Sequence, residues 1–391
     1  MTELAFEAPL TAAIVKGVVE LERTANGVVL HRLPAKARAQ NDDPQLAMAE
    51  AQPSGVRLAF RTAARKVSLT VLTTRRDFVG MPARPLGVYE LYVDGVLAQQ
   101  LSAEGGRTLR IDMRAGSTEV VDGPAAVLSF DLPAGDKQVE IWLPHNESMV
   151  LQALHADAPI SPEPVAGRPV WLHHGSSISQ GSNAILPTGI WTVFAARRAG
   201  VELINLGFGG GALLDPFTAR AMRDTAADLI SVKLGINVVN ADLMRLRAFG
   251  PAVHGFLDTI RDGHEATPLL VIGPIHCPIH EETPGPLQFD TAALAEGRVG
   301  FVATGQSAEV AAGKLSLRVI RERLKAIVEQ RQKSDPNIHY LDGEALYGPD
   351  DHALMPLPDR VHPDAATQQM MGERFATLVF EGGVFAPLAA H

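Results

Sequence analysis

Short runs of alternating apolar and polar residues dominate the chain up to about residue 150. Side chains that alternate with a period of two face opposite sides of a strand, so each run predicts a half-buried β-strand. The runs cover residues 55–60, 67–72, 87–95, 108–111, 126–132 and 138–143. Asp94-Gly95 adds a hairpin signal, because this dipeptide suits the two-residue turn between antiparallel strands. Many short strands without a long helical window predict a β-sandwich or jelly roll.

A different pattern begins at about residue 168, where apolar runs alternate with windows long enough for helices. The expected strands are residues 170–173, 201–206, 229–234, 269–272 and 338–341. The expected helices are residues 190–199, 217–227, 242–261, 315–332 and 365–380. Near-continuous apolar strands separated by helices predict a parallel sheet covered on both faces, which is a three-layer α/β/α domain. Ligands of such domains bind beyond the carboxyl ends of the strands.

These two patterns divide the chain into an amino-terminal β domain, residues 1–160, and a carboxyl-terminal α/β domain, residues 168–391. Residues 156–165 have no periodicity and carry three prolines, so we expect a linker there. Residues 276–306 interrupt the second pattern and are rich in proline, glycine and acidic residues. A long irregular insertion of this kind predicts a binding loop or lid, with disorder as the alternative.

Composition excludes several classes of partner and site. The 391 residues include 35 basic and 44 acidic side chains, and the formal charge of −9 gives no general attraction to nucleic acid. No run approaches the roughly 18 apolar residues of a membrane span, and the acidic amino terminus does not resemble a signal peptide. We therefore expect a cytoplasmic protein. The single cysteine, Cys277, excludes an intrachain disulfide and a cysteine-based metal cage.

Chemically suggestive residues follow three of the predicted strands. Ser177 lies at the bend after the first strand, where an exposed hydroxyl could act as a nucleophile or merely cap a helix, as Ser176 or Ser179 could also do. The second strand runs into residues 209–211, three glycines whose N–H groups can face a substrate. The third precedes Asn237, whose amide can donate a hydrogen bond to an oxyanion.

A carboxylate and an imidazole with complementary chemistry occur near the carboxyl terminus. Asp359 precedes His362 by three residues, a spacing that lets the carboxylate accept a hydrogen bond from one ring nitrogen. The other nitrogen could then take a proton from Ser177, whose hydroxyl is a weak nucleophile at neutral pH. His352 is the nearest rival for the base. Taken alone, the spacing could arise by chance among the 13 histidines.

Other histidines suggest metal binding more weakly. His173 and His174 are neighbours on a strand and point to opposite faces, which favours packing roles. His276 and His280, with Glu281 and Glu282 nearby, have a zinc-like spacing that lacks a helical context. We therefore expect no metal site, and Cys277 is interpreted as a small buried residue.

Taken together, these segments resemble the SGNH hydrolase superfamily, also called GDSL esterases and lipases. Gly175-Ser176-Ser177-Ile178 stands where the family has Gly-Asp-Ser-Leu, and Gly207-Phe208-Gly209-Gly210 matches its second block. Gly235-Ile236-Asn237 matches the third block, and Asp359 with His362 matches the Asp-x-x-His block.

Two positions of the second domain depart from the family pattern. Ser176 and Val238 stand where the family usually has aspartate, but related subfamilies have Gly-Ser-Ser-Ile, and neither departure removes a catalytic role.

The first domain carries a further resemblance. Residues 87–92, Gly-Val-Tyr-Glu-Leu-Tyr, look like a degenerate Gly-x-Asp-Leu-Tyr signature of β-rich domains attached to some of these esterases.

The resemblance implies a flavodoxin-like strand order and a serine esterase mechanism without a cofactor. Ser177 would be the nucleophile, His362 the base and Asp359 its partner, while the N–H groups of Ser177 and Gly210 and the Asn237 amide would bind the oxyanion. The implied substrate is a short- or medium-chain ester, with O-acetyl groups on sugars as one candidate and thioesters still open. The alternative is a non-catalytic carbohydrate- or partner-binding protein on a retired esterase fold. Homo-oligomer formation stays open.

Overall fold

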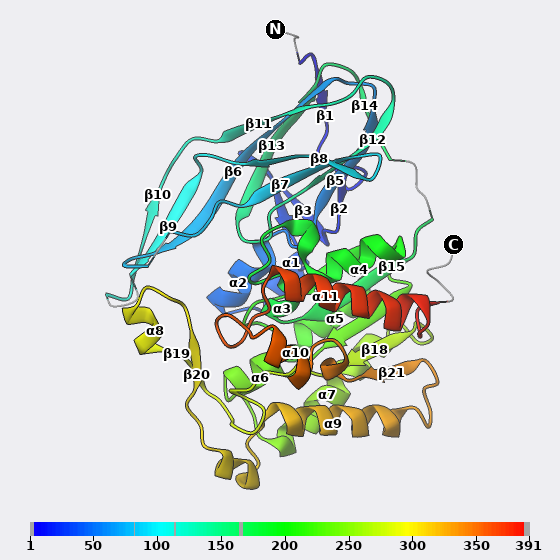
Figure 1. The fold of residues 1–391 in the computed structure, drawn as a ribbon. Helices are drawn as coiled ribbons and strands as arrows, with labels where there is room; N and C mark the ends of the chain where they lie inside the picture. Colours follow the sequence, from blue (N-terminus) through cyan, green and yellow to red (C-terminus); the bar gives the residue numbers. More distant parts are fainter. Residues whose placement is uncertain (1–3, 82, 113–114, 164–166, 387–391) are drawn as a thin grey trace. The chain divides into compact units, whose positions relative to one another are not determined.

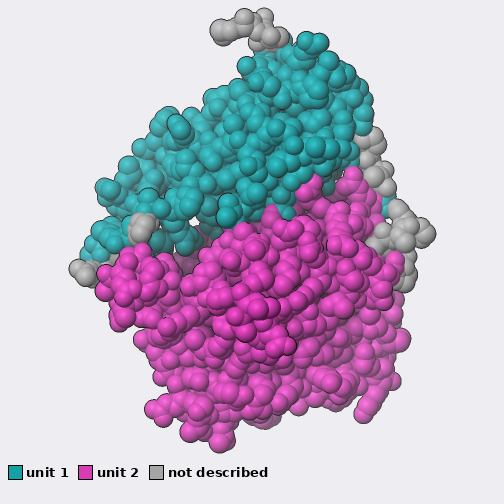
Figure 2. All heavy atoms as spheres, viewed as in Figure 1, with its two compact units in different colours: residues 1–34, 50–167, 185–188 teal, residues 35–49, 168–184, 189–391 magenta. Residues whose placement is uncertain are grey.

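The computed structural model describes residues 4–81, 83–112, 115–163 and 167–386, and its elements are shown in Figure 1. The chain divides into two compact units, coloured separately in Figure 2. Unit 1 comprises the described residues of 1–34, 50–167 and 185–188, and unit 2 those of 35–49, 168–184 and 189–391. The sequence pattern puts one boundary between residues 160 and 168. The structure adds two exchanges, because residues 35–49 belong to unit 2 and residues 185–188 to unit 1.

Unit 1 is built from two β-sheets. The strands of the first are β1 (Phe6–Ala8), β3 (Glu20–Thr24), β4 (Gly27–His31), β6 (Lys66–Phe78), β9 (Arg107–Asp112), β10 (Ser117–Val121), β11 (Ala126–Asp131) and β13 (Ser148–Ala156). Their order is β10-β9-β6-β13-β4-β3, with β1 on β13 and β11 on β6. The strands of the second are β2 (Val15–Lys16), β5 (Arg57–Thr62), β7 (Val88–Val93), β8 (Val96–Ser102), β12 (Lys137–Trp142) and β14 (Ile160–Pro162). Their order is β14-β5-β12-β7-β8, with β2 on β5.

The two sheets of unit 1 share one hydrophobic core. The alternation of residues along β11 illustrates how this core forms. Ala126, Leu128 and Phe130 are buried, while the residues between them are exposed. The same core receives Phe60 from β5 and Ile141 from β12 of the other sheet. Inward-facing residues from both sheets make this unit a β-sandwich, as the period-two pattern predicts.

The predicted hairpin is confirmed, whereas the predicted linker is partly wrong. Asp94 and Gly95 both have positive φ, 49° and 81°, and join the antiparallel strands β7 and β8. Within residues 156–165, however, Ala156 ends β13 and residues 160–162 form β14, which pairs with β5. Proline is tolerated in such a strand because an edge position leaves its missing N–H unneeded. Residues 164 and 165 lie outside the described residues.

Unit 1 holds residues 185–188 through a buried carboxylate. Glu90 of β7 is fully buried and accepts hydrogen bonds from the Thr188 N–H at 2.9 Å and the Thr188 hydroxyl at 2.7 Å. The Tyr92 hydroxyl lies 3.1 Å from the same threonine oxygen. Glu90 and Tyr92 belong to the segment 87–92 singled out from the sequence, so that segment anchors the chain that follows residue 184.

Unit 2 contains the predicted five-stranded parallel sheet. Its strands are β15 (Val170–Gly175), β16 (Glu202–Gly207), β17 (Leu229–Lys233), β18 (Leu269–Ile272) and β21 (Ile338–Leu341). Their order is β16-β15-β17-β18-β21 and every pairing is parallel, so the predicted fold class and flavodoxin-like order are confirmed. Every residue of β17 and β18 is buried, because helices cover both faces.

The main helices of unit 2 form the two outer layers. They are α4 (Trp191–Ala199), α5 (Pro216–Asp224), α7 (Leu246–Arg261), α9 (Leu317–Arg331) and α11 (Ala365–Phe375), which continues as a π-helical stretch, Ala376–Glu381. α4 and α11 pack together on one face, while α7 and α9 lie on the other (Figure 1). This division follows from right-handed crossovers, since the chain moves in opposite directions along the sheet after β15 and after β17.

Shorter elements fill the remaining segments of unit 2. They are α1 (Ala35–Arg38), α2 (Pro44–Ala51, in unit 2 through residue 49), α3 (Ser177–Gln180), α6 (Ile236–Asn240), α8 (Thr291–Ala295), α10 (Pro349–Leu354) and 3₁₀ turns at Gly343–Ala345 and Ser307–Ala312. A further 3₁₀ turn, Pro187–Gly189, lies between α3 and α4 in the sequence and belongs to unit 1 through residue 188. The segment 276–306 is not wholly irregular: β19 (Leu287–Phe289) and β20 (Phe301–Ala303) form a two-stranded hairpin around α8. None of the helices in the described ranges has the length and apolar character needed to cross a bilayer.

Candidate active site

Ser177 lies at the first position of α3, directly after β15. Gly175 ends that strand, where a Cβ would come 2.4 Å from the Ser179 hydroxyl, so a larger residue would have to displace that hydroxyl. Ser176 is the N-cap, and its hydroxyl accepts from the Ile178 N–H at 3.3 Å. Because Ser176 fills the capping role, the Ser177 hydroxyl is available for another partner. It lies 2.8 Å from Nε2 of His362.

His362 and Asp359 form a tight turn that joins them through several hydrogen bonds. Nδ1 of His362 lies 2.7 Å from Oδ2 of Asp359, and Oδ1 accepts from the N–H groups of Val361 at 2.9 Å and His362 at 2.7 Å. Burial raises the pKa of Asp359, but the bonds and charge of His362 and the two backbone donors outweigh it and hold that pKa below its ordinary value. Asp359 is therefore an anion at neutral pH, suited to keep a proton on Nδ1 of His362.

Two side chains that the sequence did not suggest support this turn. Asn183 donates from Nδ2 to Oδ2 of Asp359 at 3.2 Å and to the His362 carbonyl at 3.5 Å. The Cys277 thiol donates to the carbonyl of Arg360, a residue with a positive φ of 72°, at 3.2 Å. Burial, with the nearby charges of Glu281 and Asp359, raises the pKa of Cys277 to about 12, so the thiol keeps its proton. No local pattern marks Asn183, because its partner lies 176 residues away.

The competing histidines occupy other positions. Nδ1 of His352 lies 2.9 Å from the Tyr347 hydroxyl, so the structure brings His362 and not His352 to Ser177. His173 is buried with Nδ1 at 2.7 Å from the Ser231 hydroxyl and Nε2 at 2.8 Å from that of Ser179. Burial lowers the pKa of His173 well below its ordinary value, so it stays neutral. These bonds fix the end of β15 and the start of α3.

The glycine segment after β16 lies against the nucleophile segment. The register pairs Gly175 with Gly207, so the ends of β15 and β16 coincide. The Gly209 N–H donates to Oε1 of Gln180 at 2.6 Å, and a Cβ on Gly209 would lie 3.4 Å from that of Ser177. Gly210 has a φ of +77°, and no hydrogen bond among the described residues engages its N–H. This leaves the Gly210 N–H as a donor beside the Ser177 segment.

Asn237 lies at the start of α6, after the end of β17. It is 3% exposed, and its Oδ1 accepts from the Ala212 N–H at 3.1 Å. This bond fixes the orientation of the amide, ties it to the glycine segment and leaves Nδ2 as the donor. β17 is the neighbour of β15 in the sheet, so Asn237 and Ser177 follow adjacent strands at the same edge.

A helix from the amino-terminal part of the chain packs on the glycine segment. Gln45 of α2 donates from Nε2 to the Gly209 carbonyl at 2.7 Å, and Leu46 contacts Gly211. A Cβ on Gly210 would lie 3.0 Å from Cγ of Gln45. The sequence assigns residues 35–49 to the β domain, and no local signal could have shown that they support the candidate site.

Asp215, the N-cap of α5, allows a prediction on stability. Burial and the neighbouring Asp43 raise its pKa to about 6 from 3.8. As pH rises from about 4 to 6, the unfolded carboxyl ionises before the folded one, so stability is lost over this range and stays lower above it. A full shift of this size corresponds to about 3 kcal/mol, which partial exposure reduces. Asp215→Asn is expected to raise the free energy of unfolding by ~1–2 kcal/mol at pH 8.

Urea unfolding of wild type and the Asp215 variant at pH 8 and pH 3.5 measures this effect. The gain should vanish at pH 3.5, and Asp43→Asn should reproduce part of it at pH 8 because it removes the repulsion alone. An equal gain at both pH values would show that charge is not its cause.

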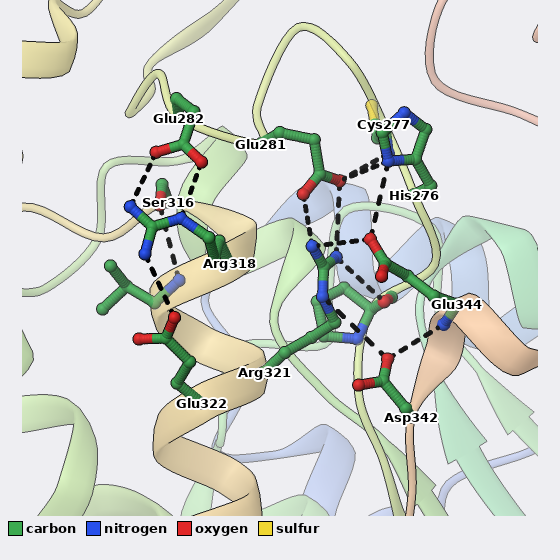
Figure 3. Close-up of polar contacts among 12 residues, drawn as sticks. His276, Cys277, Glu281, Glu282, Ser316, Arg318, Arg321, Glu322, Asp342 and Glu344 are labelled. Carbon is green, nitrogen blue, oxygen red and sulfur yellow. Dashed lines mark hydrogen bonds and ion pairs between the residues drawn. The ribbon is translucent and has the colours of Figure 1, made fainter. Parts of the chain in front are cut away.

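Two of the residues considered for a metal, His276 and Glu281, belong to an ion-pair network (Figure 3). Nδ1 of His276 lies 3.3 Å from Oε1 of Glu281 and 3.6 Å from Oε1 of Glu344. The three side chains meet the spacing of a metal site. However, the Arg321 guanidinium bonds to Glu281 and lies 2.9 Å from Glu344, so a protein cation already balances both carboxylates. His280 bonds the Thr283 carbonyl through Nδ1 at 3.0 Å.

Comparisons with known proteins agree with this architecture. Residues 168–279 match the GDSL-like Lipase/Acylhydrolase family, and residues 14–152 match the SsfX3 N-terminal domain. Among solved structures, the salicylyl-acyltransferase SsfX3 from a tetracycline biosynthetic pathway is similar at 27% identity and a TM-score of 0.76, over 94% of both chains. No curated protein matches the sequence.

Two further structures share the fold at lower identity. A protein named as a GDSL-like lipase from Bacteroides ovatus is 18% identical, with a TM-score of 0.67 over 94% of this chain and 95% of that one. A family two carbohydrate esterase from Clostridium thermocellum is 12% identical, with a TM-score of 0.54 over 84% of this chain and 92% of that one. The chain therefore carries a GDSL-like lipase/acylhydrolase domain preceded by an SsfX3-type N-terminal domain, and the resemblance predicted from the motifs is confirmed. The matched family supports ester hydrolysis or acyl transfer.

Proposed function

We propose that this protein is a serine esterase or acyl transferase that works through an acyl-enzyme on Ser177. The observation that carries the proposal is the continuous chain from the Ser177 hydroxyl to Nε2 of His362 at 2.8 Å and from Nδ1 of His362 to Asp359 at 2.7 Å. A serine hydroxyl needs such a base to attack an ester at neutral pH, and a neutral imidazole needs a partner that fixes its tautomer.

In the proposed mechanism, the Asp359 carboxylate accepts a hydrogen bond from the Nδ1–H group of His362, which keeps that proton on Nδ1 and leaves Nε2 free to accept the proton of Ser177. Oγ of Ser177 then attacks the ester carbonyl carbon, and the negative charge moves to the carbonyl oxygen. The N–H groups of Ser177 and Gly210 and Nδ2 of Asn237 would stabilise that oxygen. His362 next gives its proton to the leaving alcohol, and an acyl-enzyme forms. Water or another alcohol reverses these steps and releases the acyl group.

The proposed substrates are esters of small molecules with short or medium acyl groups. Aromatic residues make up 5% of the chain, which argues against a wide stacking platform for a polysaccharide. Acetylated sugars remain one substrate to assay, since carbohydrate esterases share the fold. Transfer of the acyl group to an alcohol is the second candidate reaction, supported by the 27% identity to a salicylyl-acyltransferase over 94% of both chains.

Labelling with a fluorophosphonate, read by intact mass and peptide mapping, tests the proposed function. Wild type is expected to gain one adduct on Ser177, because an activated serine attacks phosphorus as it attacks a carbonyl. The Ser177→Ala protein should gain none, and Ser176→Ala should still be labelled because Ser176 only caps α3. Unlabelled wild type would contradict the proposal and favour a non-catalytic binding protein.

A further inference from the structure

The hairpin of β19 and β20 carries an aromatic pair that the proposed mechanism does not use. The register places Phe289 opposite Phe301, and their rings stack with centroids 5.1 Å apart. Phe289 is 43% exposed, although burial of an aromatic ring of this size is favourable. The pair therefore presents an open apolar surface to solvent.

This hairpin is attached directly to the turn that holds Asp359 and His362. The Phe301 N–H donates to the Asp359 carbonyl at 3.1 Å, and the Phe301 ring meets the His362 ring edge-on at a centroid distance of 5.9 Å. The Arg360 guanidinium lies 3.6 Å from Asp290, the N-cap of α8 within the hairpin loop. Phe301 consequently lies beside the imidazole, and Phe289 is stacked on Phe301.

The position of the aromatic pair beside His362 determines which part of a bound ester the pair can contact. The imidazole gives its proton to the oxygen of the leaving alcohol, and in the return step takes a proton from the oxygen of the acceptor. Both oxygens must therefore lie within hydrogen-bond reach of Nε2. The acyl chain extends from the carbonyl carbon, whose oxygen faces Gly210 and Asn237. A group next to His362 thus contacts the alcohol side of the reaction.

We propose that Phe289 and Phe301 form the alcohol subsite of this enzyme and select apolar, above all aromatic, alcohols as leaving groups or acceptors. This inference rests on the proposed acyl-enzyme mechanism. In the transfer step, the acceptor O–H gives its proton to Nε2 of His362, its oxygen forms the new ester bond to the acyl carbon, and the bond from that carbon to Oγ of Ser177 breaks. The serine oxygen takes the proton back. No co-reactant beyond the alcohol is needed.

Competition between acceptors for one acetyl-enzyme tests this subsite. p-Nitrophenyl acetate supplies the acetyl group, equal concentrations of benzyl alcohol and 1-propanol compete for it, and gas chromatography measures the two acetate esters. Wild type should favour benzyl acetate. Phe289→Ala is expected to lower the ratio of benzyl to propyl acetate about 5-fold, or about 1 kcal/mol, through the loss of the aromatic contact. Phe289→Leu should cause a smaller loss.

Matched variants separate the subsite from general damage. Leu378, on the π-helical stretch, is 45% exposed and resembles Phe289 in this respect, so Leu378→Ala should leave the ratio unchanged. Phe301→Leu retains the backbone bond to Asp359 and should also lower the ratio. Thermal melts would show that each variant is folded. If wild type transfers to neither alcohol, the ratio of kcat/KM for hydrolysis of benzyl and propyl acetate replaces the product ratio, with the same expected change.

An unchanged ratio in both phenylalanine variants would overturn the proposal. So would a changed preference between p-nitrophenyl acetate and octanoate with an unchanged alcohol ratio, because that result would place the pair on the acyl side. With either result, Ser177 should still be labelled by the fluorophosphonate, so the proposed mechanism would stand. Conversely, absence of labelling and turnover in wild type would refute the mechanism itself.

Discussion

Replacement of Ser177 by alanine should lower kcat for p-nitrophenyl acetate by about 10⁴- to 10⁶-fold. Alanine removes the only atom that can form the acyl-enzyme in the proposed mechanism, while Ser176 continues to cap α3. Steady-state kinetics, with a pre-steady-state burst assay for the acyl-enzyme, would measure the loss. The Ser177 hydroxyl bonds only to His362 among the described residues, so stability should change little.

Ser179→Ala is the matched control for this prediction. Ser179 is two residues away on the same helix, and its hydroxyl bonds to His173 and not to His362. It should keep most of the wild-type kcat, with a cost mainly in stability. Residual activity of Ser177→Ala within about tenfold of wild type would contradict the assignment of the nucleophile.

Asp359→Asn is expected to lower kcat by about 10⁴-fold, the size of loss caused by the same change in a serine protease triad. The asparagine keeps the shape of the turn, but it removes the negative charge that stabilises the imidazolium and can donate to Nδ1, which reverses the tautomer. The rate of fluorophosphonate labelling should fall with kcat, because both depend on the same base. A merely structural role would instead lower the melting temperature and leave the labelling rate of the folded protein intact.

Asp364→Asn provides a nearby control for the loss of one carboxylate. Asp364 is the N-cap of α11 and accepts from the Thr367 N–H at 2.9 Å, a role that asparagine also fills. Its activity should remain close to that of wild type. Equal losses in the two variants would show that Asp359 has no special relation to His362.

Local patterns sufficed for the main strands and helices of unit 2 and for nominating the candidate site residues. Buried strands such as β17 and β18 are continuous apolar runs, and each is followed by a turn that sequence alone marks with glycine or proline. Parallel strands present their carboxyl ends at one edge, so Ser177 and Asn237 could be assigned to the same edge of the sheet without knowing the strand order. Asp359 and His362 were linked by their spacing, whereas their approach to Ser177 required the assembled sheet.

The parts that could not be predicted depend on contacts between distant segments. Gln45 meets Gly209 across 164 residues, and Asn183 meets Asp359 across 176. Neither amide has a pattern that distinguishes it from a solvated loop residue. The β19–β20 hairpin was missed for another reason, since strands of three residues among prolines and glycines give too short an alternation to detect.

The exchange of residues 35–49 and 185–188 between the two units has a consequence for dissection of the chain. No single cleavage point yields two self-sufficient halves, because a fragment that begins at residue 168 lacks the helix seated on the glycines beside the nucleophile. A chimera in which another domain replaces residues 1–160 would lose that helix as well. A shortened protein that consists of unit 2 should therefore include residues 35–49, connected to residue 168 by a designed linker. It should also replace the hydrogen bonds that Thr188 makes with Glu90.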